Sequence, residues 1–328
     1  VRRQHLLSDF CGQLWWRLCN LPQCLSVPLS VVFVGELGID AGGLRKECLQ
    51  LVLRQLCELT SLFTELEELP GLLWFKPTAD YWNKGFIPQG DEGHDIEWSK
   101  HLPEIAGAIV GLAAFNSIYL DLRLHPSIYR FFVQRSVQSN FEDLRAMHPT
   151  LHRSLVSLKK ADIRSMELSW SVRLPGASTD VDLSRGEQVD PVKPGLELEQ
   201  FASAYAEAAL VGGVRFQLEG FVRTAVAGMA VGPAYSLCSA HDLELLVCGL
   251  PDIGNFRELE ASCTYSNGLT AESATVRFFW QVVHEMAEIW KRKLLLFCTG
   301  SDRVPILGLK ALGFVVSYSS ADLDHLPT

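Results

Sequence analysis

Cysteine is the residue in this sequence best suited to act as a nucleophile or a metal ligand, because its thiolate attacks acyl groups and binds soft cations. The nine cysteines are at positions 11, 19, 24, 48, 57, 238, 248, 263 and 298. Their number is odd, no Cys-x-x-Cys pair occurs, and most lie inside apolar runs, which argues against a disulfide framework or a zinc site. We therefore expect reduced thiols in an intracellular protein, in the cytoplasm with the nucleus as a second compartment.

Histidine and carboxylate spacing predicts no metal site. His284 and Glu285 begin a His-Glu-x-x-His pattern, but Glu288 stands where the second histidine is needed. The acidic loop 91–95 could hold a cation, although a solvated loop is the favoured interpretation because the sequence places no other ligand nearby. Neither a phosphate-binding glycine loop nor a nucleophile-elbow motif occurs. Spacing alone thus predicts no catalytic residue, no metal and no cofactor.

Composition narrows the class of protein. A net charge of −9 argues against a nucleic-acid surface, and 48% hydrophobic with 20% charged residues is typical of a globular domain. The longest apolar run, 105–120, contains Asn116 and Ser117 and is shorter than the roughly 20 residues that span a bilayer, so a buried helix is expected instead of a membrane span. No signal peptide is visible. The sequence starts with valine and ends in Leu326-Pro327-Thr328, so we expect an excised fragment.

Hydrophobic periodicity predicts mostly helices in the first 160 residues. Helices are expected over 3–20, 44–59, 98–119, 126–134, 140–146 and 149–159, and strands over 29–34 and 71–75. The helix over 98–119 carries Gly107, Ala108, Gly111, Ala113 and Ala114 among its apolar residues. Because small residues let neighbouring backbones approach, this helix is expected to be central and packed on several sides.

The pattern changes after Met166. Short strands are expected over 168–172 and 181–183, followed by a helical pair over 196–229 that Gly212-Gly213 interrupts, a short helix or strand over 241–248, a helix over 273–290 and a strand over 312–316. The best linker is Gly249-Leu250-Pro251-Asp252, since glycine frees the backbone and proline stops the preceding element. The fold class is therefore α+β, with a boundary near residue 250.

Six segments, in the same order, resemble landmarks of the HECT-type ubiquitin-ligase family. The first, 32–47, is a strand, a turn rich in glycine and acidic residues, and a helix. The others are 109–121, 244–249, 275–280, 297–305 and His325-Leu326-Pro327-Thr328, the last of which is similar to the lead-in to the family's active site. The resemblance runs from about residue 25 to residue 328.

The resemblance implies a bilobal α+β fold. It places a mostly helical larger lobe over 1–248, with a small β-containing subdomain at about 150–230 that binds the conjugating enzyme. A hinge would follow at Gly249, Leu250 and Pro251, and a partial smaller lobe over 252–328. An ordinary loop remains the alternative for residues 249–251. Arg303 would either tie the smaller lobe together or contact ubiquitin.

The resemblance also implies a reaction: a ligase cysteine accepts ubiquitin from a conjugating enzyme as a thioester and passes it to a substrate lysine. In the family this cysteine follows Leu-Pro-Thr almost at once, so it is expected just past Thr328 and no catalytic residue is assigned within these residues. The chain alone is then expected to be inactive. The alternatives are a non-catalytic adaptor that docks conjugating enzymes or substrates, and, more remotely, a thiol enzyme that uses Cys298.

The expected partners are a ubiquitin-conjugating enzyme, ubiquitin and a protein substrate, with no nucleic acid and no membrane span. By position in the family, the conjugating enzyme would contact an apolar wall of three spaced pairs, Leu151 with Leu155, Met166 with Leu168, and Phe201 with Tyr205. The alternative is that these are core residues. Acidic and amide neighbours at 199, 200 and 207 favour exposure of the Phe201 and Tyr205 pair.

Overall fold

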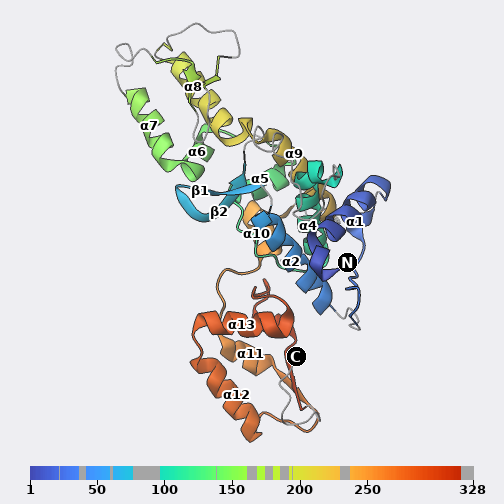
Figure 1. Ribbon diagram of the computed structural model, residues 1–328. Helices are drawn as coiled ribbons and strands as arrows, with labels where there is room; N and C mark the ends of the chain where they lie inside the picture. The colour runs from blue at the N-terminus through green and yellow to red at the C-terminus, as the bar shows by residue number, and fades with distance from the viewer. Residues whose placement is uncertain are drawn as a thin grey trace.

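The computed structural model describes residues 1–21, 23–36, 42–59, 62–76, 97–137, 139–160, 168–173, 180–184, 192–193, 195–229 and 237–318. Over these residues it is a mixed structure of helices with three two-stranded sheets. The molecule is elongated, with α7 and α8 at one end and α11 to α13 at the other (Figure 1). No described helix is long and apolar enough to cross a membrane.

The larger part of the structure precedes residue 250. Its helices are α1 (Leu6–Asn20), α2 (Gly43–Leu59), α4 (Leu102–Phe115), α5 (Pro126–Gln134), α6 (Phe141–Met147), α7 (Pro149–Lys160), α8 (Leu196–Glu207), α9 (Arg215–Met229) and α10 (Ala240–Cys248). Its strands form two antiparallel pairs, β1 (Phe63–Leu66) with β2 (Leu69–Phe75), and β3 (Ser171–Val172) with β4 (Val181–Asp182). The predicted central helix is confirmed as α4, since nearly all of its residues are buried.

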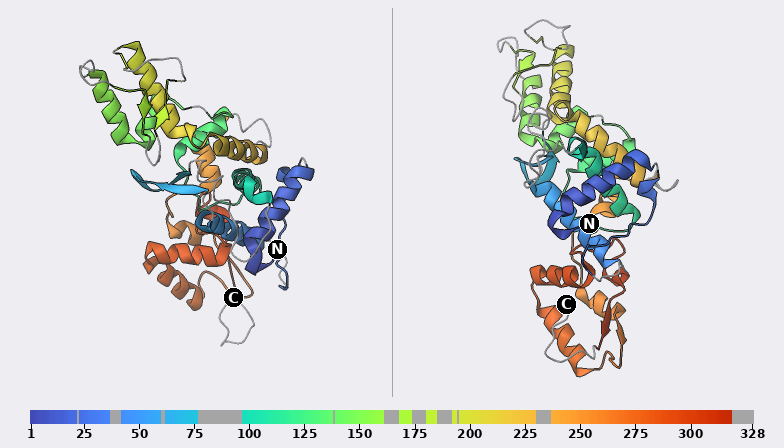
Figure 2. Two further views of the ribbon diagram at one scale, coloured as in Figure 1. Left: turned by 45° about the horizontal axis from the view of Figure 1, so that its top comes forward. Right: turned by 45° about the vertical axis from the view of Figure 1, so that its right-hand side comes forward.

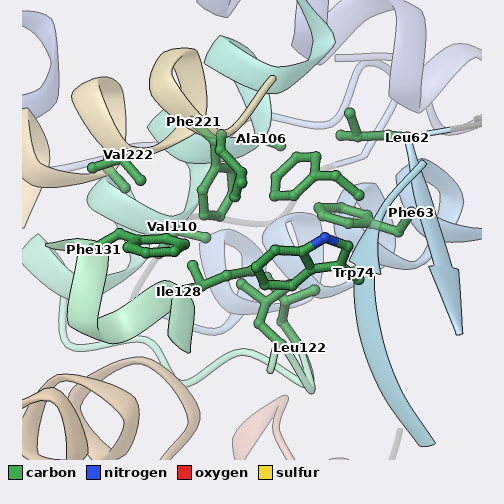
Figure 3. Packing of buried hydrophobic residues seen from close by; sticks show 14 of the residues in the cluster. Leu62, Phe63, Trp74, Ala106, Val110, Leu122, Ile128, Phe131, Phe221 and Val222 are labelled. Carbon is green, nitrogen blue, oxygen red and sulfur yellow. The ribbon is translucent and has the colours of Figure 1, made fainter. Parts of the chain in front are cut away.

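The contact between α4 and α9 depends on glycine. A Cβ atom at Gly107 would lie 2.2 Å from the carbonyl oxygen of Phe221, and one at Gly111 would lie 2.9 Å from the Cα atom of Gly228. The two backbones therefore touch, and Phe221 extends from α9 into the main core. There its ring packs against those of Phe75, at 5.2 Å between centroids, and Phe132, at 5.7 Å. Figure 3 shows Phe221 in this core together with Phe63, Trp74 and Phe131.

A second hydrophobic core follows residue 250. The helices α11 (Phe256–Ser262), α12 (Ala274–Glu285) and α13 (Glu288–Thr299) pack beside a parallel pair, β5 (Thr264–Ser266) with β6 (Val315–Ser317). Their buried apolar residues form a cluster separate from the one that ends at Val247. We call residues 253–318 the C-terminal unit and residues 1–248 the N-terminal unit.

Two predicted elements differ from the structure. The strand expected over 29–34 is extended, with Val31 and Phe33 buried and Val32 and Val34 exposed, but forms no ladder. The terminal amine of Val1 donates to the carbonyl of Val32, and the amide of Val34 donates to the carbonyl of Val1. The helix expected over 273–290 divides into α12 and α13 because Met286 and Ala287 adopt extended backbone angles.

Candidate functional site

One end of the N-terminal unit is a small subdomain of α6, α7, α8, β3 and β4, which projects away from the C-terminal unit (Figure 2). A buried aromatic pair holds it together, since the ring of Phe201 on α8 lies 5.6 Å from that of Trp170 in an edge-to-face arrangement. Such geometry suits the ring quadrupoles. Trp170 and Phe201 belong to the same buried cluster as Phe221, so the interior of the subdomain continues the main core of the N-terminal unit.

The structure divides the predicted wall residues into two groups. Leu155 is 4% exposed and Phe201 is 1% exposed, so both are core residues. The expectation that Phe201 is exposed is wrong, because its face of α8 turns toward Trp170. Leu151, Leu168 and Tyr205 are half-buried at the surface, and Met166 lies outside the described residues.

Tyr205 is the aromatic residue at the rim of this subdomain. Its ring lies 6.0 Å from that of Phe201, and its hydroxyl donates a hydrogen bond of 3.4 Å to the carbonyl of Arg173. Burial raises the pKa of Tyr205, so the phenol is neutral at physiological pH. Arg173 in turn pairs with Asp180 at 2.7 Å. These two charged rim residues were missed by the sequence analysis, which contained no signal for them.

Arg215 joins the two connections between the small subdomain and the rest of the N-terminal unit. One of its guanidinium nitrogens donates to the carbonyl of Val137, at 3.1 Å, on the incoming chain. The other donates to Glu207, at 2.7 Å, at the end of α8. The outgoing chain then makes a π-helical turn over Ala208–Gly212. The break predicted near residue 212 is therefore confirmed, with Arg215 bridging both crossings.

The predicted hinge residues are held from both sides. Gly249 donates its amide hydrogen to Leu245 of α10, at 2.8 Å, whereas Leu250 donates to Val304 of the C-terminal unit, also at 2.8 Å. Arg292 of α13 donates to the carbonyl of Pro251 at 3.1 Å. Gly249 has a φ of 71°, which favours glycine, and a Cβ atom there would lie 2.5 Å from the carbonyl oxygen of Val304. Gly249 is thus the residue between the two sets of anchors.

Six of the described thiols are disfavoured as nucleophiles by burial. Desolvation raises the pKa of Cys11, Cys24, Cys57, Cys248, Cys263 and Cys298. The values for Cys57 and Cys248 reach about 11, and Cys248 bonds to the carbonyl of Leu122 at 3.2 Å. A thiol with a raised pKa holds little thiolate at neutral pH and is a weak nucleophile. Among the described residues there is also no group of three or more histidine, cysteine or carboxylate side chains placed to hold a metal ion.

The family model described as "HECT-domain (ubiquitin-transferase)" matches residues 50–328, most of the chain. The chain therefore belongs to the HECT-domain family of ubiquitin transferases. It is 28% identical over 332 residues to "Probable E3 ubiquitin-protein ligase HERC4" of Homo sapiens, covering 100% of this chain and 29% of that protein.

Other relatives agree with this assignment. "Probable E3 ubiquitin-protein ligase HECTD2" of Mus musculus is 28% identical over 345 residues, with 100% of this chain and 41% of that protein covered. "E3 ubiquitin-protein ligase UPL2" of Arabidopsis thaliana is 28% identical over 322 residues, with 95% and 8% covered. The chain spans less than half the length of each of these curated relatives.

Proposed function

We propose that this chain is the ligase region of a protein that accepts ubiquitin as a cysteine thioester and transfers it to a substrate lysine. In the first step a ligase thiolate attacks the carbonyl that joins ubiquitin to the conjugating enzyme, and that enzyme's thiolate leaves. In the second step a lysine amine attacks the new thioester, which forms an amide and returns the ligase thiol. The HECT-domain match over residues 50–328 is the observation that carries this proposal.

The two hydrophobic clusters support a bilobal organisation, with lobes over 1–248 and 252–328 and a hinge at 249–251. Each cluster is closed by its own helices, and the connection between them passes through Gly249. Transfer between two sulfur atoms requires the lobe that carries the ligase cysteine to change its position relative to the conjugating enzyme. A single permissive glycine between two anchored segments suits such a rotation.

The surface that we propose for the conjugating enzyme is formed by Leu151, Leu168 and Tyr205. These side chains are half-buried on α7, before β3 and on α8, so they offer apolar area to a partner while remaining fixed by the core. Phe201 is buried with its ring 6.0 Å from that of Tyr205, and Leu155 is buried one helical turn after Leu151. Tyrosine is one of the residues enriched in binding hot spots, and Tyr205 lies at the partly exposed apolar rim of this surface.

Replacing Tyr205 with alanine is expected to weaken conjugating-enzyme binding by about 1–2 kcal/mol, roughly tenfold in Kd. The ring supplies the contact area, so Tyr205→Phe should bind nearly as well as the parent. Titration calorimetry against the tightest-binding member of a panel of conjugating enzymes measures the change. Tyr318→Ala, at an exposed tyrosine in the C-terminal unit, is the matched control. Equal affinities for Tyr205→Ala and the parent, with unchanged circular dichroism, would place the binding surface elsewhere.

These 328 residues, expressed by themselves, are expected to form no thioester with ubiquitin. The cysteines with raised pKa values are protonated at neutral pH and therefore react slowly with a charged conjugating enzyme. Non-reducing gels with and without dithiothreitol detect any adduct. A thiol-sensitive ubiquitin adduct that disappears in Cys298→Ser would contradict this prediction and support the thiol-enzyme alternative.

A further inference from the structure

Among the described residues, 300–306, which follow α13, contact α2 and the loop that follows α4 in the N-terminal unit. Gly300 has a φ of 74°, and a Cβ atom there would lie 3.4 Å from the Cβ atom of Lys46 and 3.6 Å from the carbonyl oxygen of Gly43, both on α2. The amide of Ile306 donates to the hydroxyl of Tyr119 at 3.4 Å. We call residues 300–306 the docking strip. The docking strip therefore contacts residues that precede it by more than 180 positions in the sequence.

The docking strip also makes an ionic contact. The guanidinium of Arg303 pairs with the carboxylate of Asp121, in the loop that follows α4. The Arg303 side chain is 10% exposed, whereas that of Asp121 is 52% exposed. Burial by itself lowers the pKa of Arg303, because desolvation disfavours the charged form. A guanidinium that is covered to this extent needs an opposite charge beside it.

Asp121 is held in place by the N-terminal unit. Its amide donates to the side-chain oxygen of Gln50 on α2 at 3.5 Å, and the side-chain nitrogen of Gln50 donates to the carbonyl of Tyr119 at 2.6 Å. Gln50 therefore fixes the backbone of Tyr119 and of Asp121, the two residues that make the polar contacts described above with the docking strip. On the other side, the amide of Arg303 donates to the hydroxyl of the buried Ser301 at 3.2 Å, which fixes the backbone of the strip.

We propose that the docking strip holds the C-terminal unit in one orientation on the N-terminal unit, and that the Arg303–Asp121 pair determines this orientation. In it, α11 to α13 lie at the opposite end of the molecule from α7 and α8 (Figure 1). The functional meaning rests on the proposed function: if α7 and α8 bind the conjugating enzyme, this is a resting orientation. Turning about Gly249 toward that enzyme then requires the ion pair to open.

The test measures the orientation directly, in the 328-residue chain and without a conjugating enzyme. Cys19 on α1 and Cys298 on α13 are the exposed cysteines of the described residues, so nitroxide labels on these two report the distance between the units. Mass spectrometry verifies two labels per chain, and pulsed dipolar spectroscopy measures the distance distribution. The parent should give one narrow distance. Asp121→Asn, which removes the charge at an exposed position, should lose that narrow distance and give a broad distribution.

Two controls separate the ion pair from general effects of substitution. Asp121→Glu keeps the charge and should keep the narrow distance. Asp9→Asn removes an aspartate that pairs with Arg2 inside the N-terminal unit, and should also keep it. A narrow distance in Asp121→Asn, or a broad one in the parent, overturns the inference. The proposed function is tested separately, because it fails if Tyr205→Ala binds the conjugating enzyme as tightly as the parent does. That substitution does not change the distance between the two labels.

Discussion

Gly107→Ala is expected to destabilise the N-terminal unit by about 2–4 kcal/mol, which is a large part of the stability of a typical domain. The added methyl group would lie 2.2 Å from the carbonyl oxygen of Phe221 and 2.3 Å from the hydroxyl of Thr224. The first of these is a backbone atom within a helix, so it cannot rotate away as a side chain would. The helices α4 and α9 must then separate, which loosens the packing of Phe221 in the core.

The matched control for this prediction is Gly43→Ala in the first turn of α2, where an added Cβ atom meets nothing within 4 Å. Helix propensity alone favours alanine over glycine by about 1 kcal/mol, so propensity predicts stabilisation at both positions. The overlap with Phe221 instead predicts that Gly107→Ala is destabilised while Gly43→Ala is not. Urea unfolding followed by circular dichroism measures both variants. A midpoint for Gly107→Ala at or above that of the parent would mean that α4 and α9 are farther apart than described.

Phe201→Ala is expected to destabilise the small subdomain by about 3–5 kcal/mol, because it removes a fully buried ring and leaves a cavity beside Trp170. Hydrogen exchange should show the loss as faster exchange in α7 and α8. Conjugating-enzyme binding should fall as well, since the wall above the cavity loses its support. Tyr205→Ala, by contrast, should weaken binding and leave exchange in these helices close to that of the parent.

Phe201→Leu distinguishes support from direct contact. Leucine refills most of the cavity, so both exchange protection and binding should largely return. If Phe201→Ala lost binding while α7 and α8 kept their protection, the ring would itself contact the partner. That result would support the sequence-based prediction that the Phe201 side chain is exposed, and would contradict its buried position in the structure.

Local sequence patterns predicted the elements whose signals lie within one segment. The helix α2 follows from apolar residues at helical spacing, and Gly212-Gly213 marked the irregular turn between α8 and α9. The break between α12 and α13 could not be predicted, because Met286-Ala287 contains neither glycine nor proline. The parallel pairing of β5 with β6 joins residues about fifty positions apart, and no pattern within either strand specifies that partner.

The candidate site was predicted less completely, for a related reason. Polar neighbours of Phe201 indicated exposure, but which face of α8 is buried depends on Trp170, in a different segment. The role of Arg303 was left open between two alternatives, and the structure shows a third arrangement, a pair with Asp121 across the two units. Contacts between residues this far apart in the sequence are set by tertiary packing, on which spacing carries no information.

The anchoring of residues 245–251 has a geometric consequence for any large motion of this protein. With the Gly249 amide fixed to α10 and Leu250 fixed to Val304, rotation between the units reduces to the two torsion angles of one residue. Every atom of the C-terminal unit then keeps a nearly constant distance from Gly249 and travels on a sphere centred there. A group carried on the C-terminal unit could therefore reach only points at its own fixed distance from Gly249.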